Sequence, residues 1–333
     1  MAERGEDPKG VLVYCQAEGG TLLPVSLELV SLGQELSARL GEPLCLAMLG
    51  GRPLAEELSR YDAARIFYCS DPKLEFYTAE VYTGAMEQIV REANPRALIV
   101  GATDQGRDLA ARLAARLDTG LTADCASLSI EPGTGRLLQT RPAFNGNVMA
   151  TIAARRTSLQ MATVHPGAHA ASPRGAGADK PRIIQLALLE TPQGARVLEE
   201  RPAGGQTPLW DADIVVAGGK GVLNARGVEL VNALARALGA AVGASRSAVE
   251  EGLFPYDQQI GQTGKSIHPR LYVACGISGS SHHMAGVRAQ TILAINRDRN
   301  APIFRKATYG VCGDLFEILP KLTALIEQSK NPV

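Results

Sequence analysis

The chain has 333 residues, of which 45% are hydrophobic, 20% are charged and 5% are aromatic, and its formal net charge is zero. This is the composition of an ordinary globular protein with room for about two domains. Because net positive charge is absent and aromatic side chains are few, the sequence disfavours a nucleic-acid-binding protein.

The amino-terminal segment has mixed charge and lacks the apolar region of a secretory signal. No apolar run approaches the ~18 residues that a membrane-spanning helix needs. We therefore expect a cytoplasmic protein without direct membrane insertion. Six cysteines are scattered without a Cys-x-x-Cys pair, so we expect buried reduced thiols and no metal site.

Strand-like and helix-like segments alternate along the first part of the chain. Apolar runs predict buried strands at residues 11–15, 44–49, 65–69 and 97–100. Amphipathic periodicity predicts helices at residues 25–40, 53–58, 77–93 and 106–117. This alternation is typical of a parallel sheet that is covered by helices on both faces.

Beyond residue 119 the pattern becomes rich in strands. Turn-forming sequences separate expected strands at residues 125–130, 137–144, 148–153 and 160–165. We expect these strands to form an extension of the first domain. Residues 166–181 are expected to form a mobile loop, and residues 183–189 another strand. Residues 199–209 are expected to form an interdomain linker.

A second domain begins near Asp213 and alternates again. Its expected strands are residues 214–217, 240–244, 271–275, 291–295 and 307–311. Its expected helices are residues 226–238, 247–251, 282–288 and 314–328. In the last helix we expect a core face made by Leu315, Ile318, Leu319, Leu322 and Leu325. The predicted organisation is a domain at residues 1–200, a linker at 201–212 and a domain at 213–333.

Turns of similar composition follow several strands of the second domain. They lie at residues 218–221, 245–246, 276–281 and 296–297 and contain small, hydroxyl, amide or cationic residues. The carboxyl ends of parallel strands meet at one edge of a sheet, where ligands of such folds bind. Glycines there let a diphosphate approach backbone N–H groups. Together the turns predict a dinucleotide cleft, without the Gly-x-Gly-x-x-Gly fingerprint of nicotinamide cofactors.

Motifs along nearly the whole chain resemble the alpha subunit of the electron transfer flavoproteins. In the second domain they are Gly-Ala-Ser-Arg at 243–246, Gly-Gln-Thr-Gly-Lys at 261–265, the strand–turn–helix–strand unit at 271–296 and Tyr-Gly…Asp-Leu-Phe at 309–316. In the first domain they are Gly-Arg-Asp-Leu at 106–109, Thr-Gly-Leu-Thr-Ala-Asp-Cys at 119–125 and Arg-Pro-Ala-Phe-Asn-Gly-Asn at 141–147.

The resemblance implies an α/β protein of two domains, each with a mainly parallel sheet flanked by helices. The first would be nucleotide-hydrolase-like with a β-rich extension, serving as scaffold and as interface to a separate beta subunit. The second would be Rossmann-like and bind FAD. The heterodimer would carry electrons from flavin dehydrogenases of the acyl-CoA dehydrogenase type, as in fatty acid beta-oxidation, to a quinone oxidoreductase. A bifurcating form that uses NADH is a variant of this hypothesis.

The resemblance also implies a set of flavin-site residues. Arg246 would lie over the flavin, Thr263 would reach N5 and His283 would approach the O2 side. Arg246 and His283 would then stabilise the negative charge of a reduced flavin. The expected cofactor-binding residues are Lys220, Ser245, Arg246, Gln259, Gly261, Gln262, Thr263, Ser278, Gly279, Ser280, Ser281, His282, His283, Asn296, Asp314 and Leu315.

The sequence departs from the family pattern at a few positions. Lys220 stands where the family commonly has Arg, and His282 stands where it usually has Gln. The segment between His283 and Asn296 is one residue short. The adjacent histidines do not predict a metal site, because neighbours on a helix point about 100° apart and no third ligand is evident.

Other interpretations remain open at this stage. Arg246 could form a surface salt bridge, Thr263 could be a turn hydroxyl that satisfies its own backbone, and His283 could pack against the sheet at the start of its helix. A non-redox module that binds adenine nucleotides is the alternative function. A nicotinamide-dependent enzyme is disfavoured because no acid/base pair is evident. Residues 103–107 look like another nucleotide pocket, which we interpret as scaffold and beta-subunit interface.

Overall fold

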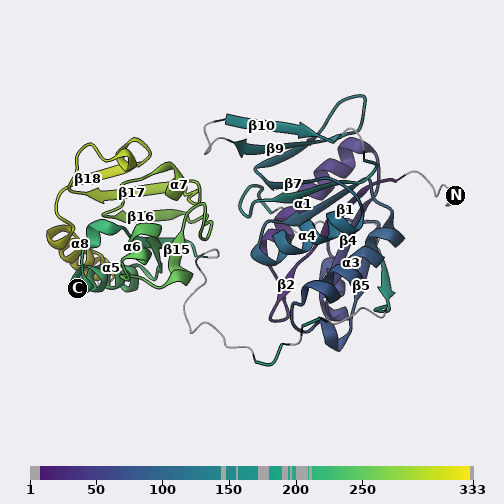
Figure 1. The fold of residues 1–333 in the computed structure, drawn as a ribbon, viewed down its shortest axis with the longest axis horizontal. Helices are drawn as coiled ribbons and strands as arrows, with labels where there is room; N and C mark the ends of the chain where they lie inside the picture. Colours follow the sequence, from purple (N-terminus) through teal and green to yellow (C-terminus); the bar gives the residue numbers. More distant parts are fainter. Residues whose placement is uncertain are drawn as a thin grey trace. The chain divides into compact units, whose positions relative to one another are not determined.

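The computed structural model describes residues 8–143, 148–154, 157–171, 180–189, 194–195, 197–199, 209 and 212–330. Its internal contacts divide the chain into unit 1, Met1–Glu200, and unit 2, Arg201–Val333 (Figure 1). Both units are α/β, with parallel sheets flanked by helices, as predicted. Residues 172–179 of the expected mobile loop and most of the expected linker lie outside the described residues.

Unit 1 is built on a parallel seven-stranded sheet of order β12-β5-β4-β1-β6-β11-β7. Its strands are β1 (Val11–Tyr14), β4 (Leu44–Leu49), β5 (Arg65–Cys69), β6 (Ala97–Gly101), β7 (Leu121–Cys125), β11 (Gln160–Val164) and β12 (Arg182–Leu186). A short antiparallel hairpin pairs β2 (Ala17–Glu18) with β3 (Thr21–Leu22). The central strands are buried along their whole length, because helices cover both faces of the sheet.

The helices of unit 1 lie where the periodicity predicts them, within a few residues at their starts. They are α1 (Pro24–Leu40), α2 (Arg52–Leu58), α3 (Ala79–Ala93) and α4 (Asp104–Arg116). Leu29 of α1 packs in the core on one face, whereas Ile89 of α3 and Leu113 of α4 pack in the core on the other. Gly41 ends α1 in the left-handed conformation, as helix-stopping glycines do.

The strand-rich segment is divided between two sheets, which corrects the expected extension. Strand β11 lies in the parallel sheet between β6 and β7, and β7 is a strand that the pattern did not predict. Only β8 (Ser127–Ile130), β9 (Leu137–Ala143) and β10 (Val148–Ala153) form the separate antiparallel sheet. Residues 160–164 are wholly buried, and this burial on both faces places the segment in the main sheet.

Unit 2 has a parallel six-stranded sheet of order β15-β14-β13-β16-β17-β18. Its strands are β13 (Ile214–Gly218), β14 (Ala241–Ser245), β15 (Gln259–Ile260), β16 (Leu271–Cys275), β17 (Thr291–Asn296) and β18 (Tyr309–Cys312). Strand β15 was not predicted. The chain leaves β13 toward β14 and later returns on the other side of β13 as β16. The strand order therefore reverses between β13 and β16, which is where ligands of such sheets bind.

The α-helices in the described part of unit 2 are α5 (Ala225–Leu238), α6 (Arg246–Glu250), α7 (Ser281–Met284) and α8 (Leu315–Lys330) (Figure 1). Helix α7 is shorter than expected, because Val287 pairs with Ile267 in a parallel bridge and the chain is extended there. The expected core face of α8 is wrong at Leu325, which is 62% exposed. Ile326 packs against the core instead.

All six cysteines are free thiols, and only Cys312 is exposed. Within the described residues, no helix combines the length and the hydropathy needed to cross a bilayer.

Candidate functional site

Two glycine-rich turns meet where the strand order of unit 2 reverses. The Gly219 N–H donates to the Cys275 carbonyl over 2.8 Å, and the Gly221 N–H donates to the Gly276 carbonyl over 3.0 Å. A Cβ on Gly276, whose φ is +64°, would lie 2.8 Å from the Cα of Gly221. The glycines are therefore required for the two turns to pack backbone against backbone.

The second of these turns presents hydroxyl groups at the carboxyl end of β16. Ser278, Ser280 and Ser281 are all exposed. Ser280 caps α7, and its Oγ accepts a hydrogen bond from the backbone N–H of His283. Gly279 has a φ of +81°, and a Cβ there would lie 2.5 Å from the Cα of Ile303. The turn is thus fixed from behind while its hydroxyls face solvent.

The loop at residues 259–265 is closed by its own hydrogen bonds. Buried Gln259 donates from Nε2 to the Thr263 carbonyl at 3.1 Å and lies 3.2 Å from Thr263 Oγ1. The Lys265 N–H donates to the Gln259 carbonyl over 2.7 Å. Gln262 and Thr263 are exposed at the tip. We call this segment the Thr263 loop; its internal bonds give it one defined shape.

Two cations of the site pair with consecutive carboxylates. Arg246 begins α6 after its capping residue Ser245, and its Nε lies 2.8 Å from Glu250 Oε1. Lys220 Nζ lies 2.6 Å from Glu251 Oε1, and this contact raises the pKa of the Lys220 ammonium. Exposed pairs of this kind contribute little to stability, because solvent screens the attraction. Both cations can therefore exchange their carboxylate for another anion at small cost.

His283 is a neutral, buried side chain. The residue is 6% exposed, with its Nδ1 3.1 Å from the Ile260 carbonyl and its Nε2 2.7 Å from the Tyr272 hydroxyl. Burial lowers the pKa of this imidazole to about 4, against a smaller opposing effect of the Ile260 hydrogen bond. The ring is therefore uncharged near neutral pH.

His282, the neighbouring histidine, is exposed and holds the Thr263 loop. Its Nδ1 lies 2.7 Å from Gln262 Oε1, and its carbonyl accepts a hydrogen bond from the Gln262 N–H over 2.8 Å. The two histidines thus contact different groups of one loop. Within the described residues, no three His, Cys, Asp or Glu side chains are grouped as metal ligands.

The remaining expected residues support the turn after β16. Asn296 donates from Nδ2 to the Ile277 carbonyl over 2.9 Å. Asp314 accepts the Phe316 N–H over 2.8 Å at the start of α8. Leu315 is buried, and a Cβ on Gly276 would lie 3.1 Å from its Cδ2. Asn296 and Leu315 thus contact the Gly276 turn from β17 and α8, whereas Asp314 bonds to the start of α8.

The register of the sheet brings Arg246, Thr263 and His283, the residues expected to tune the flavin, to one edge. Ser245 of β14 pairs with Ile260 of β15, so Arg246 and the Thr263 loop continue from the same level of neighbouring strands. His283 reaches the same level through the Ile260 carbonyl. Arg246 makes the surface salt bridge and His283 makes the contact with the sheet that were given as their alternative roles, whereas Thr263 Oγ1 meets the Gln259 side chain and not its own backbone. Their roles toward a flavin stay predictions.

Sequence reasoning did not identify three residues of this site. Glu250 had a signal, since it lies four residues after Arg246 and such pairs meet on one helix face. Glu251 contacts Lys220 from a distant part of the chain and had no signal. Tyr272 lies in an apolar strand, where nothing in the local pattern marks its hydroxyl as a partner of His283.

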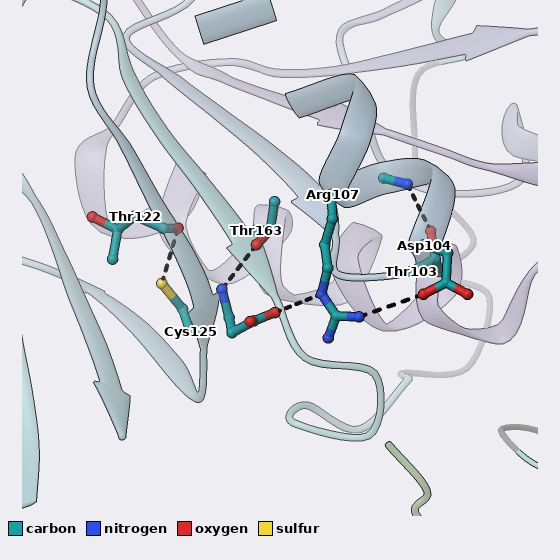
Figure 2. Close-up of polar contacts among 8 residues, drawn as sticks. Thr103, Asp104, Arg107, Thr122, Cys125 and Thr163 are labelled. Carbon is teal, nitrogen blue, oxygen red and sulfur yellow. Dashed lines mark hydrogen bonds and ion pairs between the residues drawn. The ribbon is translucent and has the colours of Figure 1, made fainter. Parts of the chain in front are cut away.

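Unit 1 has a polar cluster at the carboxyl ends of β6, β7 and β11 (Figure 2). Arg107 Nε lies 2.9 Å from Asp124 Oδ1, and its Nη1 lies 3.6 Å from Asp104 Oδ1. The Asp124 N–H donates to Thr163 Oγ1 over 2.9 Å, and the Gly106 N–H donates to Thr103 Oγ1 over the same distance. The members of the cluster bond to one another.

Comparison with known proteins identifies similar sequences along both units. Residues 11–190 match the family described as electron transfer flavoprotein domain, and residues 208–288 match the electron transfer flavoprotein FAD-binding domain. Protein FixB of Clostridium saccharobutylicum is 41% identical over 321 residues, covering 96% of each chain. Electron transfer flavoprotein subunit alpha of Thermoanaerobacterium thermosaccharolyticum is 39% identical, covering 97% of this chain and 99% of that one. Acryloyl-CoA reductase electron transfer subunit beta of Anaerotignum propionicum is 36% identical, covering 97% of each.

Proposed function

We propose that this chain, which belongs to the electron transfer flavoprotein alpha-subunit family with FAD as its cofactor and electron transfer as its role, works in a heterodimer with a beta subunit. It binds FAD at the carboxyl edge of the unit 2 sheet. The match of residues 208–288 to the FAD-binding domain carries this proposal. The flavin supplies the redox chemistry, while the protein binds, orients and tunes it.

The residues at this edge fit such a cofactor. The exposed hydroxyls of Ser278, Ser280 and Ser281 suit the polar ribityl chain and diphosphate, and the cations Lys220 and Arg246 suit the negative charge. The Gly276 turn is held rigidly from β17 and α8. A rigid edge with exposed donors binds an anionic ligand with little ordering on binding.

Arg246 and Thr263 are the proposed tuning residues that reach the flavin directly. Arg246 exchanges Glu250 for the flavin, and its guanidinium then stabilises negative charge on the reduced ring. The Thr263 hydroxyl, presented at the exposed tip of its loop, donates to or accepts from N5. His283 approaches the O2 side as a neutral group, so Arg246 supplies the positive charge.

The proposed partners follow from the same family. Unit 1 forms the interface to the beta subunit, flavin dehydrogenases of the acyl-CoA dehydrogenase type donate electrons, and a quinone oxidoreductase accepts them. A bifurcating complex that takes electrons from NADH is the variant form. The similarity to a protein named as an acryloyl-CoA reductase electron transfer subunit supports a partner that acts on acyl-CoA substrates.

The test is to purify the chain together with its beta subunit and to measure bound flavin. We expect a yellow complex with one FAD attributable to this chain, and Arg246→Ala should weaken FAD binding and lower the flavin's one-electron potential. A colourless complex that is stabilised against heat by adenine nucleotides but not by FAD would instead identify the non-redox nucleotide-binding module.

A further inference from the structure

His282 and His283 hold the Thr263 loop from outside, in addition to the bonds within it. Gln262 of the loop contacts His282 through both its backbone N–H and its side chain. Ile260, at the start of the loop, is contacted through its carbonyl by Nδ1 of His283. Gly261 has a φ of +137° and packs against the backbone of Gly286. A Cβ on Gly286 would lie 2.7 Å from the Cα of Gly261.

The hydrogen bond to Ile260 requires one tautomer of His283. A carbonyl oxygen can only accept, so the proton of the neutral ring lies on Nδ1, and Nε2 is an acceptor. The Tyr272 hydroxyl, 2.7 Å from Nε2, is then the donor. Burial raises the pKa of this phenol well above its ordinary value, so the hydroxyl keeps its proton.

Loss of that donor would weaken the hold on the ring. With the Tyr272 hydroxyl gone, Nε2 of a buried ring lacks its donor, and a ring that turns to find another partner for Nε2 loses its bond to Ile260. The Ile260 residue is 1% exposed, so water does not readily replace the bond. An unsatisfied buried carbonyl costs about 1–3 kcal/mol, and the chain can avoid this cost by moving the loop.

We propose that Tyr272 is a positioning residue for the FAD site, because its hydroxyl donates to Nε2 of His283 and so holds in place the ring that anchors the Thr263 loop. Tyr272 is 0% exposed and acts only through His283. The inference rests on the proposed function, in which this loop contacts the flavin. It accounts for a polar side chain in a strand that is otherwise apolar.

The test uses Tyr272→Phe in the purified heterodimer. In the wild type, ¹⁵N chemical shifts of the His283 ring should show the Nδ1–H form, and in the variant the shift of Nε2 should show that its hydrogen bond is lost. Amide hydrogen exchange of residues 259–265 should accelerate ~10-fold, with strand β17 unchanged, and the Kd for FAD should rise ~5–30-fold, as expected for one buried hydrogen bond.

Two further variants separate positioning from general stability. Tyr82→Phe removes another buried phenol hydrogen bond, the one to the Leu74 carbonyl in unit 1, and should leave both the loop and the Kd unchanged. His283→Asn keeps a donor near the Nδ1 position and has no Nε2. In that background, Tyr272→Phe should add less than ~2-fold to the Kd, as coupled residues require.

The inference is overturned if wild-type His283 carries its proton on Nε2, or if folded Tyr272→Phe leaves loop exchange unchanged. It is also overturned if Tyr272→Phe has the same effect in the wild type and in the His283→Asn background. If the wild-type heterodimer binds no FAD, the proposed function fails, whereas the ring shifts and loop exchange still decide the role of Tyr272.

Discussion

Arg246 of α6 lies with its Nε 2.8 Å from the carboxylate of Glu250, one helical turn later, and both side chains are more than half exposed, at 64% and 58%. If Arg246 must leave Glu250 to meet FAD, the pair competes with the cofactor. We expect Glu250→Gln to lower the Kd for FAD by about 1.5- to 5-fold, the equivalent of about 0.2–1 kcal/mol for an exposed pair. Flavin fluorescence titration of the apoprotein measures this change.

Arg52 and Glu56 of α2 form a matched control for that experiment. Their spacing is also four residues, their distance is 2.9 Å, and their side chains are 69% and 57% exposed. Glu56→Gln should leave the Kd for FAD unchanged. Equal effects of the two substitutions would show that Arg246 has no special competition with the cofactor.

Gly276 should tolerate no side chain. Gly276→Ala would place a Cβ 2.8 Å from the Cα of Gly221 at a φ of +64°, so steric overlap adds to backbone strain. Gly239→Ala, at a φ of +66° with open space around it, isolates the strain. We expect the free energy of unfolding to fall by about 1 kcal/mol for Gly239→Ala and by about 3 kcal/mol for Gly276→Ala. Similar losses in urea titrations would contradict the backbone packing of the two turns.

Leu223 is the centre of a strained turn between β13 and α5. It has a φ of 68° and a ψ of −39°, and the Asn224 N–H donates to the Val222 carbonyl over 2.8 Å, which defines a γ-turn of the positive-φ type. The Leu223 side chain is 54% exposed, so shortening it removes few contacts. Leu223→Gly should therefore be about 1 kcal/mol more stable than Leu223→Ala, because glycine adopts positive φ without strain. An alanine variant as stable as the glycine variant would contradict this.

His283 should make stability depend on pH. Burial lowers the pKa of its imidazole from 6.5 to about 4, so the unfolded state takes up a proton first as the pH falls. The stability that the neutral ring contributes is fully present above pH ~6.5 and falls as the pH drops from ~6.5 to ~4. Below pH ~4 the free energy of unfolding has lost about 3 kcal/mol in total from this group.

The non-titrating variant His283→Asn isolates this effect. Between pH 7 and pH 5, the wild type should lose about 2 kcal/mol more free energy of unfolding than the variant, since the exposed groups are shared by both proteins. Urea unfolding at the two pH values measures the difference. Parallel pH dependence of the two proteins would show that the His283 ring is not buried as a neutral group.

Sequence periodicity predicted most elements of both sheets because each element has a local signal. The apolar run at residues 44–49 and the amphipathic pattern of α3 are examples, and both elements lie where expected. Strand β15 has two residues, too few for any period, and was missed. Strand β11 was predicted as a strand, but its sheet depends on which distant strands it meets, β6 and β7.

For the site, the sequence by itself determined which chemical groups are present and which protein family they indicate. The glycines, hydroxyls and cations that follow parallel strands are visible as local motifs. Only the tertiary structure decided what those groups contact. Tyr272 and Ile260 meet the His283 ring from positions 11 and 23 residues away in the chain, and together with burial they leave it neutral. Charge state and tautomer are set by desolvation and by such partners, and neither is encoded in the residues adjacent to His283.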